Sequence, residues 1–199
     1  MGLQLITAPL VYPITLEEAK AHLRVDYSDD DALINALISA ATLHVDGKDG
    51  WLGRALVEQT WDLHLDAFPC DAIKIPLPPL ISVTGVFYRD DDGIERTMLS
   101  EDYEVDNRSE PGWVVPGDDG WPSVLDTINT VRVRFVAGYA SGEDSPSDAT
   151  DYIPMPIKQG ILMYVATMYA HRENFVIGQS AVGLPWAAEQ LLQPYRIYG

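Results

Sequence analysis

The sequence predicts an α+β fold, in which helices from both ends of the chain pack together and a mainly antiparallel β-sheet region is inserted between them. Helical patterns appear in residues 13–47 and again in 156–174 and 186–192, and strand-like alternation with turn signals lies between. Short connections favour antiparallel pairing of the strands. We divide the chain into an N-terminal helical part, a β-rich insertion, and a linker with a long helix and tail, at residues 1–50, 51–140 and 141–199. The helical parts are expected to form one core.

The first twelve residues are expected to be extended, because Pro9 and Pro13 limit helix formation. The first helix is expected to begin at Thr15, whose hydroxyl can accept a hydrogen bond from a free backbone amide while Glu18 reaches back from three residues on. The polar groups of this segment serve helix ends and its apolar groups serve packing, so it indicates scaffold rather than chemistry.

The second helix is expected to begin near Ser28, with three aspartates in its first turn, where negative charge suits the helix dipole. Gly47 is expected to end it. Its apolar spacing predicts one wide buried stripe, formed by Leu33, Leu37, Ala40 and His44 with Ile34, Ile38, Ala41 and Val45 beside them.

From Val57 onward apolar residues recur at every second position, with Asp62, His64 and Asp66 on the alternate face. This pattern predicts a half-buried strand with an acidic, solvent-facing side. The Asp-Asp-Asp-Gly run at 90–93 predicts a hairpin turn, because Asp-Gly tolerates a positive φ. Further strands are expected at residues 72–75, 83–89, 94–99, 103–106, 113–115 and 131–137, which gives six or seven in all.

Arg132 and Arg134 alternate on one face of the last expected strand, and with Arg89 or Arg96 they could form a basic face. We expect them to neutralise neighbouring acidic turns. Contact with phosphate and a salt bridge between subunits are the alternatives.

The C-terminal part reads as an acidic linker at 138–152, a long helix and a short final helix. The long helix is expected from about Pro156 to Asn174, with Gly160 weakening it slightly. The final helix is expected at 186–192, closed by Pro194.

The formal net charge of −17 is the outlying feature of the composition. So acidic a surface repels phosphate, which argues against direct binding to nucleic acid. The charge is unevenly distributed along the chain, since residues 158–199 carry only Glu173 and Glu189 as acids. The same residues are rich in aromatic side chains. Such a composition is typical of protein interfaces, although for residues 157–170 an ordinary core helix explains it equally well. Beyond Gly178 we favour an interface.

No catalytic, metal or cofactor site is expected. The aspartates at 90–92 lack the end ligands of a calcium loop, the four histidines are scattered, and the single cysteine, Cys70, forms no cluster. Neither a nucleophile elbow nor a phosphate-binding glycine loop occurs. No apolar run reaches the roughly 18 residues of a membrane span, so we expect no membrane segment.

Several segments resemble, in the same order, the head–tail connector (adaptor) proteins of tailed bacteriophages and gene-transfer particles. These segments are PITLEEAKAHLRVD, DDDALI with its alanines, TWDLHLDAFP, IPLPPLISVTGVFYRDDDG, VRVRFVAGY, PMPIKQGILMYVATMYAHREN and LLQPYR. The resemblance spans nearly all of residues 9–198. None of these segments is catalytic, so the ordered set carries the resemblance.

The resemblance implies a structural protein of a virion or phage-like neck, assembled in the bacterial cytoplasm, that is not an enzyme and uses no cofactor. Copies of the chain, usually twelve, would form a ring under the portal protein, extend the DNA channel without binding DNA specifically, and dock a stopper or tail protein. It also implies a C-terminal portal contact, which we place at residues 184–198. We expect helices 29–46 and 156–174 to build the ring wall and its lateral contacts. The expected anchors are Trp186, Leu191, Leu192, Tyr195 and Arg196.

Two other functions stay open. The chain could be a head-completion (stopper) or tail-terminator ring protein of the same particle. A hydrolase acting from the acidic loops is the remote alternative.

Overall fold

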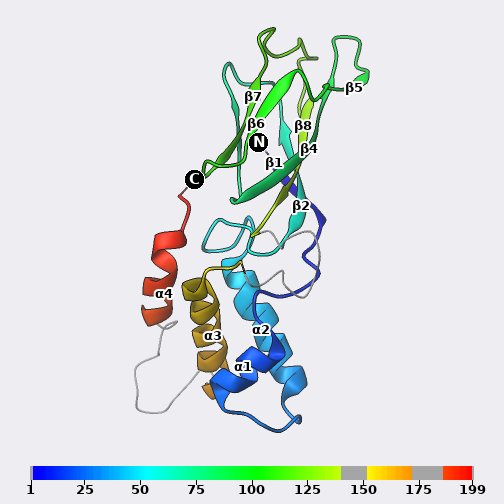
Figure 1. The fold of residues 1–199 in the computed structure, drawn as a ribbon. Helices are drawn as coiled ribbons and strands as arrows, with labels where there is room; N and C mark the ends of the chain where they lie inside the picture. Colours follow the sequence, from blue (N-terminus) through cyan, green and yellow to red (C-terminus); the bar gives the residue numbers. More distant parts are fainter. Residues whose placement is uncertain (1, 140–151, 172–185, 199) are drawn as a thin grey trace. The chain divides into compact units, whose positions relative to one another are not determined.

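The computed structural model describes residues 2–139, 152–171 and 186–198, and the chain divides into two compact units (Figure 1). The sheet unit comprises Met1–Leu10 and Val57–Ala140, and the helical unit comprises Val11–Leu56 and Ser141–Gly199. Each unit is therefore built from two separate stretches of chain. The α+β class is confirmed, but the first ten residues belong with the sheet and not with the N-terminal helices.

The helical unit contains four α-helices and a short 3-10 helix among its described residues. The helix α3 packs against α1, α2 and α4 (Figure 1). The bounds are α1 Leu16–Leu23, α2 Asp31–Val45, α3 Met155–Ala170, α4 Trp186–Leu192 and the 3-10 helix η2 Gln193–Tyr195. Its fully buried side chains include Ile34, Ile38, Ile157, Ile161 and Leu192.

The capping box at the start of α1 is confirmed. Glu18 N donates to Thr15 Oγ1 at 3.1 Å, and Thr15 N donates to Glu18 Oε2 at 2.8 Å. The other oxygen of the same carboxylate, Oε1, lies 2.6 Å from Nζ of Lys158 on α3, whose side chain is almost fully buried. The Glu18 carboxylate thus accepts a hydrogen bond from the Thr15 backbone amide at the N-terminus of α1 and also neutralises the buried ammonium of Lys158.

Helix α2 begins at Asp31, three residues later than expected, with Asp30 as its N-cap. The Asp30 side chain makes no capping hydrogen bond. Its Oδ2 instead accepts hydrogen bonds from the hydroxyls of Tyr169, at 2.5 Å, and Tyr27, at 3.3 Å. A tertiary contact with the end of α3 has therefore replaced the local cap.

The buried stripe of α2 is narrower than expected. Ile34, Ile38, Ala41 and Val45 are buried, as predicted. The prediction is wrong for the adjacent row, because Leu33 and Leu37 are half-buried and Ala40 and His44 are exposed. A helix packed on one side buries only one such row fully.

The long helix α3 ends at Ala170, and its C-cap His171 has non-helical backbone angles. The expected extension through His171 is therefore wrong, and the remainder of it, residues 172–174, lies outside the described residues. Pro156 lies in the first turn, as expected.

Gly160 lies at the contact between α3 and α4. A Cβ atom at this position would meet Leu192 Cγ at 2.8 Å and Cδ2 at 2.9 Å. Gly160 therefore allows the two helices to approach closely, at the cost of a weaker helix propensity.

The sheet unit contains two antiparallel sheets. The five-stranded sheet has the order β1-β2-β8-β4-β5, and the three-stranded sheet has the order β3-β7-β6. The strands are β1 Gly2–Thr7, β2 Gln59–Leu65, β3 Ile73–Ile75, β4 Leu80–Arg89, β5 Glu95–Thr97, β6 Tyr103–Asp106, β7 Gly112–Pro116 and β8 Val131–Ala137. The seven expected strands are present, and β1, expected only to be extended, pairs with β2 as an eighth.

The core of the sheet unit lies on one face of the five-stranded sheet. On β8, Val131, Val133 and Phe135 are fully buried, and Arg132 and Arg134 on the alternate positions are partly exposed. The strand β7 passes close to β4 on the buried side, since a Cβ atom at Gly112 would lie 2.5 Å from Leu80 Cδ2. The opposite face of the five-stranded sheet carries the arginines.

Substituting Gly160→Ala tests the contact between α3 and α4. Helix propensity alone would stabilise the protein by about 1 kcal/mol. We expect the reverse, a loss of about 1 kcal/mol, because overpacking a fixed core position outweighs propensity. Urea unfolding measures the change, with Gly2→Ala as the control, since a Cβ atom at Gly2 meets nothing within 4 Å. A more stable Gly160→Ala variant would contradict the packing argument.

Candidate functional site

The C-terminal segment is fastened to the loop that follows α2, within the helical unit. Arg54 Nε donates a hydrogen bond to the backbone oxygen of Tyr195, and Ile197 N donates to Leu52 O at 2.9 Å. The Arg196 guanidinium lies over two aromatic rings, 4.4 Å from the centre of Trp51 and 5.0 Å from that of Tyr198. Such cation–π contacts and backbone hydrogen bonds hold the segment in one conformation.

The five expected anchors do not form one exposed surface. Trp186 is 73% exposed and Leu191 is 37% exposed, so both are available to a partner. Leu192 is fully buried against Gly160 and belongs to the core of the unit, which corrects its expected place on the surface. Tyr195 and Arg196 are half-buried and already engaged with the loop after α2.

Sequence reasoning missed two parts of this arrangement. Trp51 lies in the Gly-punctuated loop after α2, which gave no signal beyond its turn residues. Tyr198 is exposed, and its hydroxyl accepts a hydrogen bond from Gln193 Nε2 at 2.6 Å. Pairing of the loop with the chain's C-terminal segment could not be read from local spacing.

A second polar site lies on the open face of the five-stranded sheet. Asp62 on β2 was expected to face solvent, but it is 3% exposed, so that expectation is wrong. Arg134 covers it with two hydrogen bonds of 2.8 Å, from Nε to Oδ1 and from Nη2 to Oδ2. Arg132 Nη1 lies 3.5 Å from Asp62 Oδ2, and Arg132 Nη2 lies 3.2 Å from Glu95 Oε1. The arginines thus neutralise carboxylates of other strands in their own sheet, and not the acidic turns that were expected.

The two arginines set the charge state of Asp62. Burial raises the pKa of this carboxyl, but the hydrogen bond from Arg134 and the charges of Arg134 and Arg132 outweigh it. The net result is a pKa below the usual value of 3.8. Asp62 is therefore ionised in the folded protein at neutral pH.

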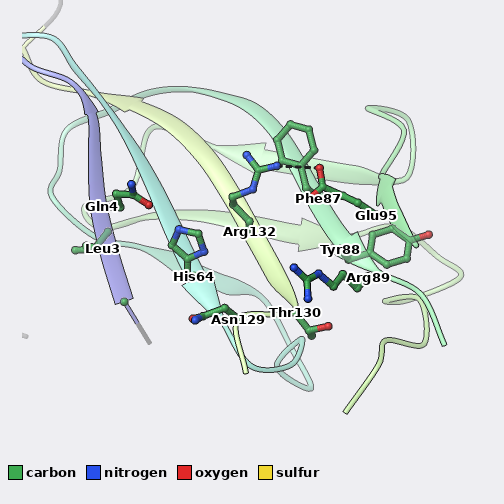
Figure 2. Close-up of a pocket in the computed structure, with 11 residues that line it drawn as sticks. Leu3, Gln4, His64, Phe87, Tyr88, Arg89, Glu95, Asn129, Thr130 and Arg132 are labelled. Atoms are coloured by element: carbon green, nitrogen blue, oxygen red, sulfur yellow. Dashed lines mark hydrogen bonds and ion pairs between the residues drawn. The ribbon is translucent and has the colours of Figure 1, made fainter. Parts of the chain in front are cut away.

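Beside this cluster lies a hollow of about 420 Å³. Figure 2 shows Arg132 between His64 of β2 and Phe87 of β4, with Arg89 and Asn129 along one side of the hollow. The Arg132 guanidinium stacks over the Phe87 ring at 4.2 Å. The hollow is lined by both polar and aromatic groups, and it lies wholly within the sheet unit.

The expected hairpin turn at 90–93 is present between β4 and β5. Asp90 Oδ1 accepts from Ile94 N at 2.9 Å, and Asp90 Oδ2 accepts from Arg96 Nε at 2.8 Å. The hydrogen bond from Arg96 and those from the turn's own amides lower the pKa of Asp90. This carboxylate is thus occupied by its own turn.

Two further searches covered the described ranges 2–139, 152–171 and 186–198. They contain no group of three or more His, Cys, Asp or Glu side chains placed to hold a metal ion. None of the helices in these ranges is both long enough and apolar enough to cross a membrane.

The C-terminal segment and the open face of the five-stranded sheet both present exposed side chains that a partner could contact. Comparison with known proteins indicates the class of protein. Residues 13–108 match the family model described as "Phage gp6-like head-tail connector protein". The resemblance to head–tail connectors is therefore confirmed over these residues. The family is one of structural connector proteins, which confirms the expectation that the chain is not an enzyme. No curated protein matches the sequence.

Solved structures match over the whole chain. They include chains of the "Neck of empty GTA particle computed with C6 symmetry", with a TM-score of 0.76, and of the "Virion of native gene transfer agent (GTA) particle", with a TM-score of 0.77. A chain of the "Neck of native GTA particle computed with C12 symmetry" matches with a TM-score of 0.66. Each is 20% identical, and the match covers 100% of this chain and 97% of that chain. These structures share the fold.

The buried charge of Asp62 predicts a pH-dependent contribution to stability. Because its pKa is lowered on folding, the contribution is present above the unfolded pKa near 3.8 and is lost as pH falls through the folded pKa. Asp62→Asn should therefore flatten the loss of stability between about pH 5 and pH 2. At neutral pH, Asp62→Ala should cost about 1.5–3 kcal/mol, because it removes the acceptor of the hydrogen bonds that the charged Arg134 donates.

Chemical denaturation at several pH values checks both expectations. Glu95→Gln is the matched control, since Glu95 also pairs with Arg132 but its side chain is 61% exposed, and it should change little. Identical acid dependence for wild type and Asp62→Asn would contradict the assignment.

Proposed function

We propose that the chain is a head–tail connector that assembles as a ring in the neck of a phage or gene-transfer particle. The observation that carries the proposal is the connector family match over residues 13–108, joined to a whole-length fold shared with chains of gene transfer agent necks. The ring would lie under the portal protein, extend the DNA channel and dock a stopper or tail protein. Assembly would take place in the bacterial cytoplasm.

The helical unit has the rigidity that a repeating wall segment needs. The Glu18–Lys158 ion pair ties α1 to α3, and the hydrogen bond from Tyr169 to Asp30 ties the end of α3 to the start of α2. Gly160 has no side chain and so leaves room for Leu192, and this contact packs α4 against α3. Copies of one shape can close a ring only if each copy keeps that shape. Helices α2 and α3 are our candidates for the ring wall.

We expect twelve copies in the ring. Two of the similar neck structures were computed with C6 and C12 symmetry, and a ring of twelve is compatible with both. The net charge of −17 suits a channel through which DNA slides, since an acidic wall repels phosphate.

We propose that the portal contact is made by the C-terminal segment, with different roles for its residues. Trp186 and Leu191 would contact the portal directly, because their side chains are exposed. Leu192, Tyr195 and Arg196 would hold the segment in place through the core and the loop after α2. Exposed aromatic and aliphatic side chains on a fixed support are typical of interface hot spots.

A head-completion or tail-terminator ring protein of the same particle is the second candidate. Such a protein also requires a rigid, repeating subunit. It differs from a connector in its position within the neck, which is not next to the portal. Cross-linking within assembled particles that places the chain away from the portal would favour it.

The double substitution Trp186→Ala with Leu191→Ala should weaken co-purification with the particle's portal protein at least tenfold, because each side chain buries apolar area only in the complex. Folding should be preserved, since neither residue is in the core. Ile128→Ala is the matched control, an equally exposed apolar side chain at 74% on the sheet unit, and it should bind normally. Undiminished binding by the double variant would remove the anchor assignment.

Mixing the purified chain with its portal should produce a ring of connector density in negative-stain micrographs. The same chain should not retain duplex DNA at about 150 mM salt, because its net charge opposes the phosphate backbone. Tight binding of duplex DNA, or failure of the chain to bind the portal, would contradict the proposed function.

A further inference from the structure

The hollow on the open face of the five-stranded sheet has no part in the portal contact proposed above. We propose that it binds an acidic turn of a neighbouring copy of this chain, the turn at 117–120, and so forms a lateral contact of the ring. The inference rests on the proposed function, since a ring is what presents a neighbouring copy in a fixed position.

The hollow offers a free positive charge. Arg89 is exposed and has no ion-pair partner among the described residues, and in Figure 2 its guanidinium points along the hollow toward the side of His64. Arg132, by contrast, is shared between Asp62 and Glu95. A carboxylate is the ligand that pairs best with a guanidinium, through two parallel hydrogen bonds.

The hollow also contains unsatisfied polar atoms. Nε2 of His64 and Oγ1 of Thr130 are buried and have no hydrogen-bond partner in the part of the chain that the structure describes. Thr130 is 2% exposed. Each such atom costs about 1–3 kcal/mol when left unpaired. An occupant that brings oxygen atoms to this floor would remove part of that cost.

The chain itself supplies the complementary group. Asp118 and Asp119 are both exposed, at the tip of a turn closed by a hydrogen bond of 3.0 Å from Gly120 N to Gly117 O. Gly120 has a φ of +73°, which keeps the turn tight and leaves the two carboxylates on a narrow tip. The two carboxylates at this tip are complementary in charge to the exposed Arg89 of the hollow.

The turn approaches the buried face of the five-stranded sheet and the hollow opens on its other face, with Tyr88 of β4 beside both. The hollow opens on the face that carries Arg132. The turn follows β7, which packs on the buried face, and the next residue, Trp121, stacks on Phe68 at 4.6 Å. Phe68 in turn contacts Tyr88, which pairs with the buried Val131 of β8. Complementary surfaces on opposite sides produce head-to-tail contacts, which are the contacts that close a cyclic ring.

DNA phosphate fits the same hollow less well. A duplex is held by many cations along its backbone, whereas the hollow combines one free arginine with the carboxylate of Glu95. Nucleic acid is therefore an outcome of the test and not the proposed occupant.

Disulfide trapping tests the contact in assembled particles. The variant carries Arg89→Cys and Asp119→Cys, with the exposed Cys70 changed to Ser. Mild oxidation of purified necks should give a ladder of covalently linked connector chains on a non-reducing gel, and reduction should collapse it. The matched control replaces Asp119→Cys by Asp91→Cys, at another exposed acidic turn, and should give no ladder.

Charge reversal gives a second readout. Arg89→Glu should lower the amount of chain incorporated into necks by about tenfold, and adding Asp119→Arg should restore it, since the pair is then reversed. Neither position lies in the core, so the variants should fold.

The outcomes separate the two proposals. Rings that form on the portal without a ladder from the Arg89–Asp119 pair would overturn the lateral contact and leave the connector function standing. A ladder from the Asp91 control alone would overturn the choice of turn. Duplex binding that Arg89→Glu abolishes would make the hollow a nucleic-acid site, and absence of the chain from necks would overturn both proposals.

Discussion

The helical unit depends on the ion pair between Glu18 and Lys158. A lysine residue that is only 6% exposed is tolerated when a carboxylate neutralises its ammonium group, because an unpaired buried charge costs several kcal/mol. Glu18 meets this requirement with one oxygen at 2.6 Å and closes the α1 capping box with the other. The two residues come from the separate stretches of chain that form this unit, so local helix formation and the joining of the stretches share one side chain.

The sheet unit follows a similar plan with the charges reversed. Here a carboxylate, Asp62, is buried, and Arg134 and Arg132 neutralise it from the neighbouring strand β8. Because Arg132 also pairs with Glu95, this face carries a network of paired charges and not a uniformly positive potential. Within a chain of net charge −17, this face is the part of the sheet unit suited to receive acidic groups.

Features set by local spacing were predictable from the sequence. The capping box of Thr15 and Glu18, the alternation along β8 and the turn at 90–93 each depend on residues within a few positions of one another. The ordered segments also predicted the connector family correctly.

Features that depend on pairing between distant segments could not be predicted. The side chain of Asp62 was assigned to solvent because alternation shows which residues share a face but not what covers it. Leu192 was assigned to a partner because nothing near it in sequence shows that Gly160 opens a space for it. The expected anchors Tyr195 and Arg196 prove to be bound by a loop more than a hundred residues away.

The fastening of the C-terminal segment has a consequence for the thermodynamics of docking. A tail that is unstructured when free loses conformational entropy on binding, about 1–2 kcal/mol for each backbone residue that becomes ordered. Residues around Tyr195 and Ile197 have already lost that freedom through their hydrogen bonds to Arg54 and Leu52. Such preorganisation lowers the cost of association, so less of the energy of the proposed contact through Trp186 and Leu191 would be spent on ordering the segment.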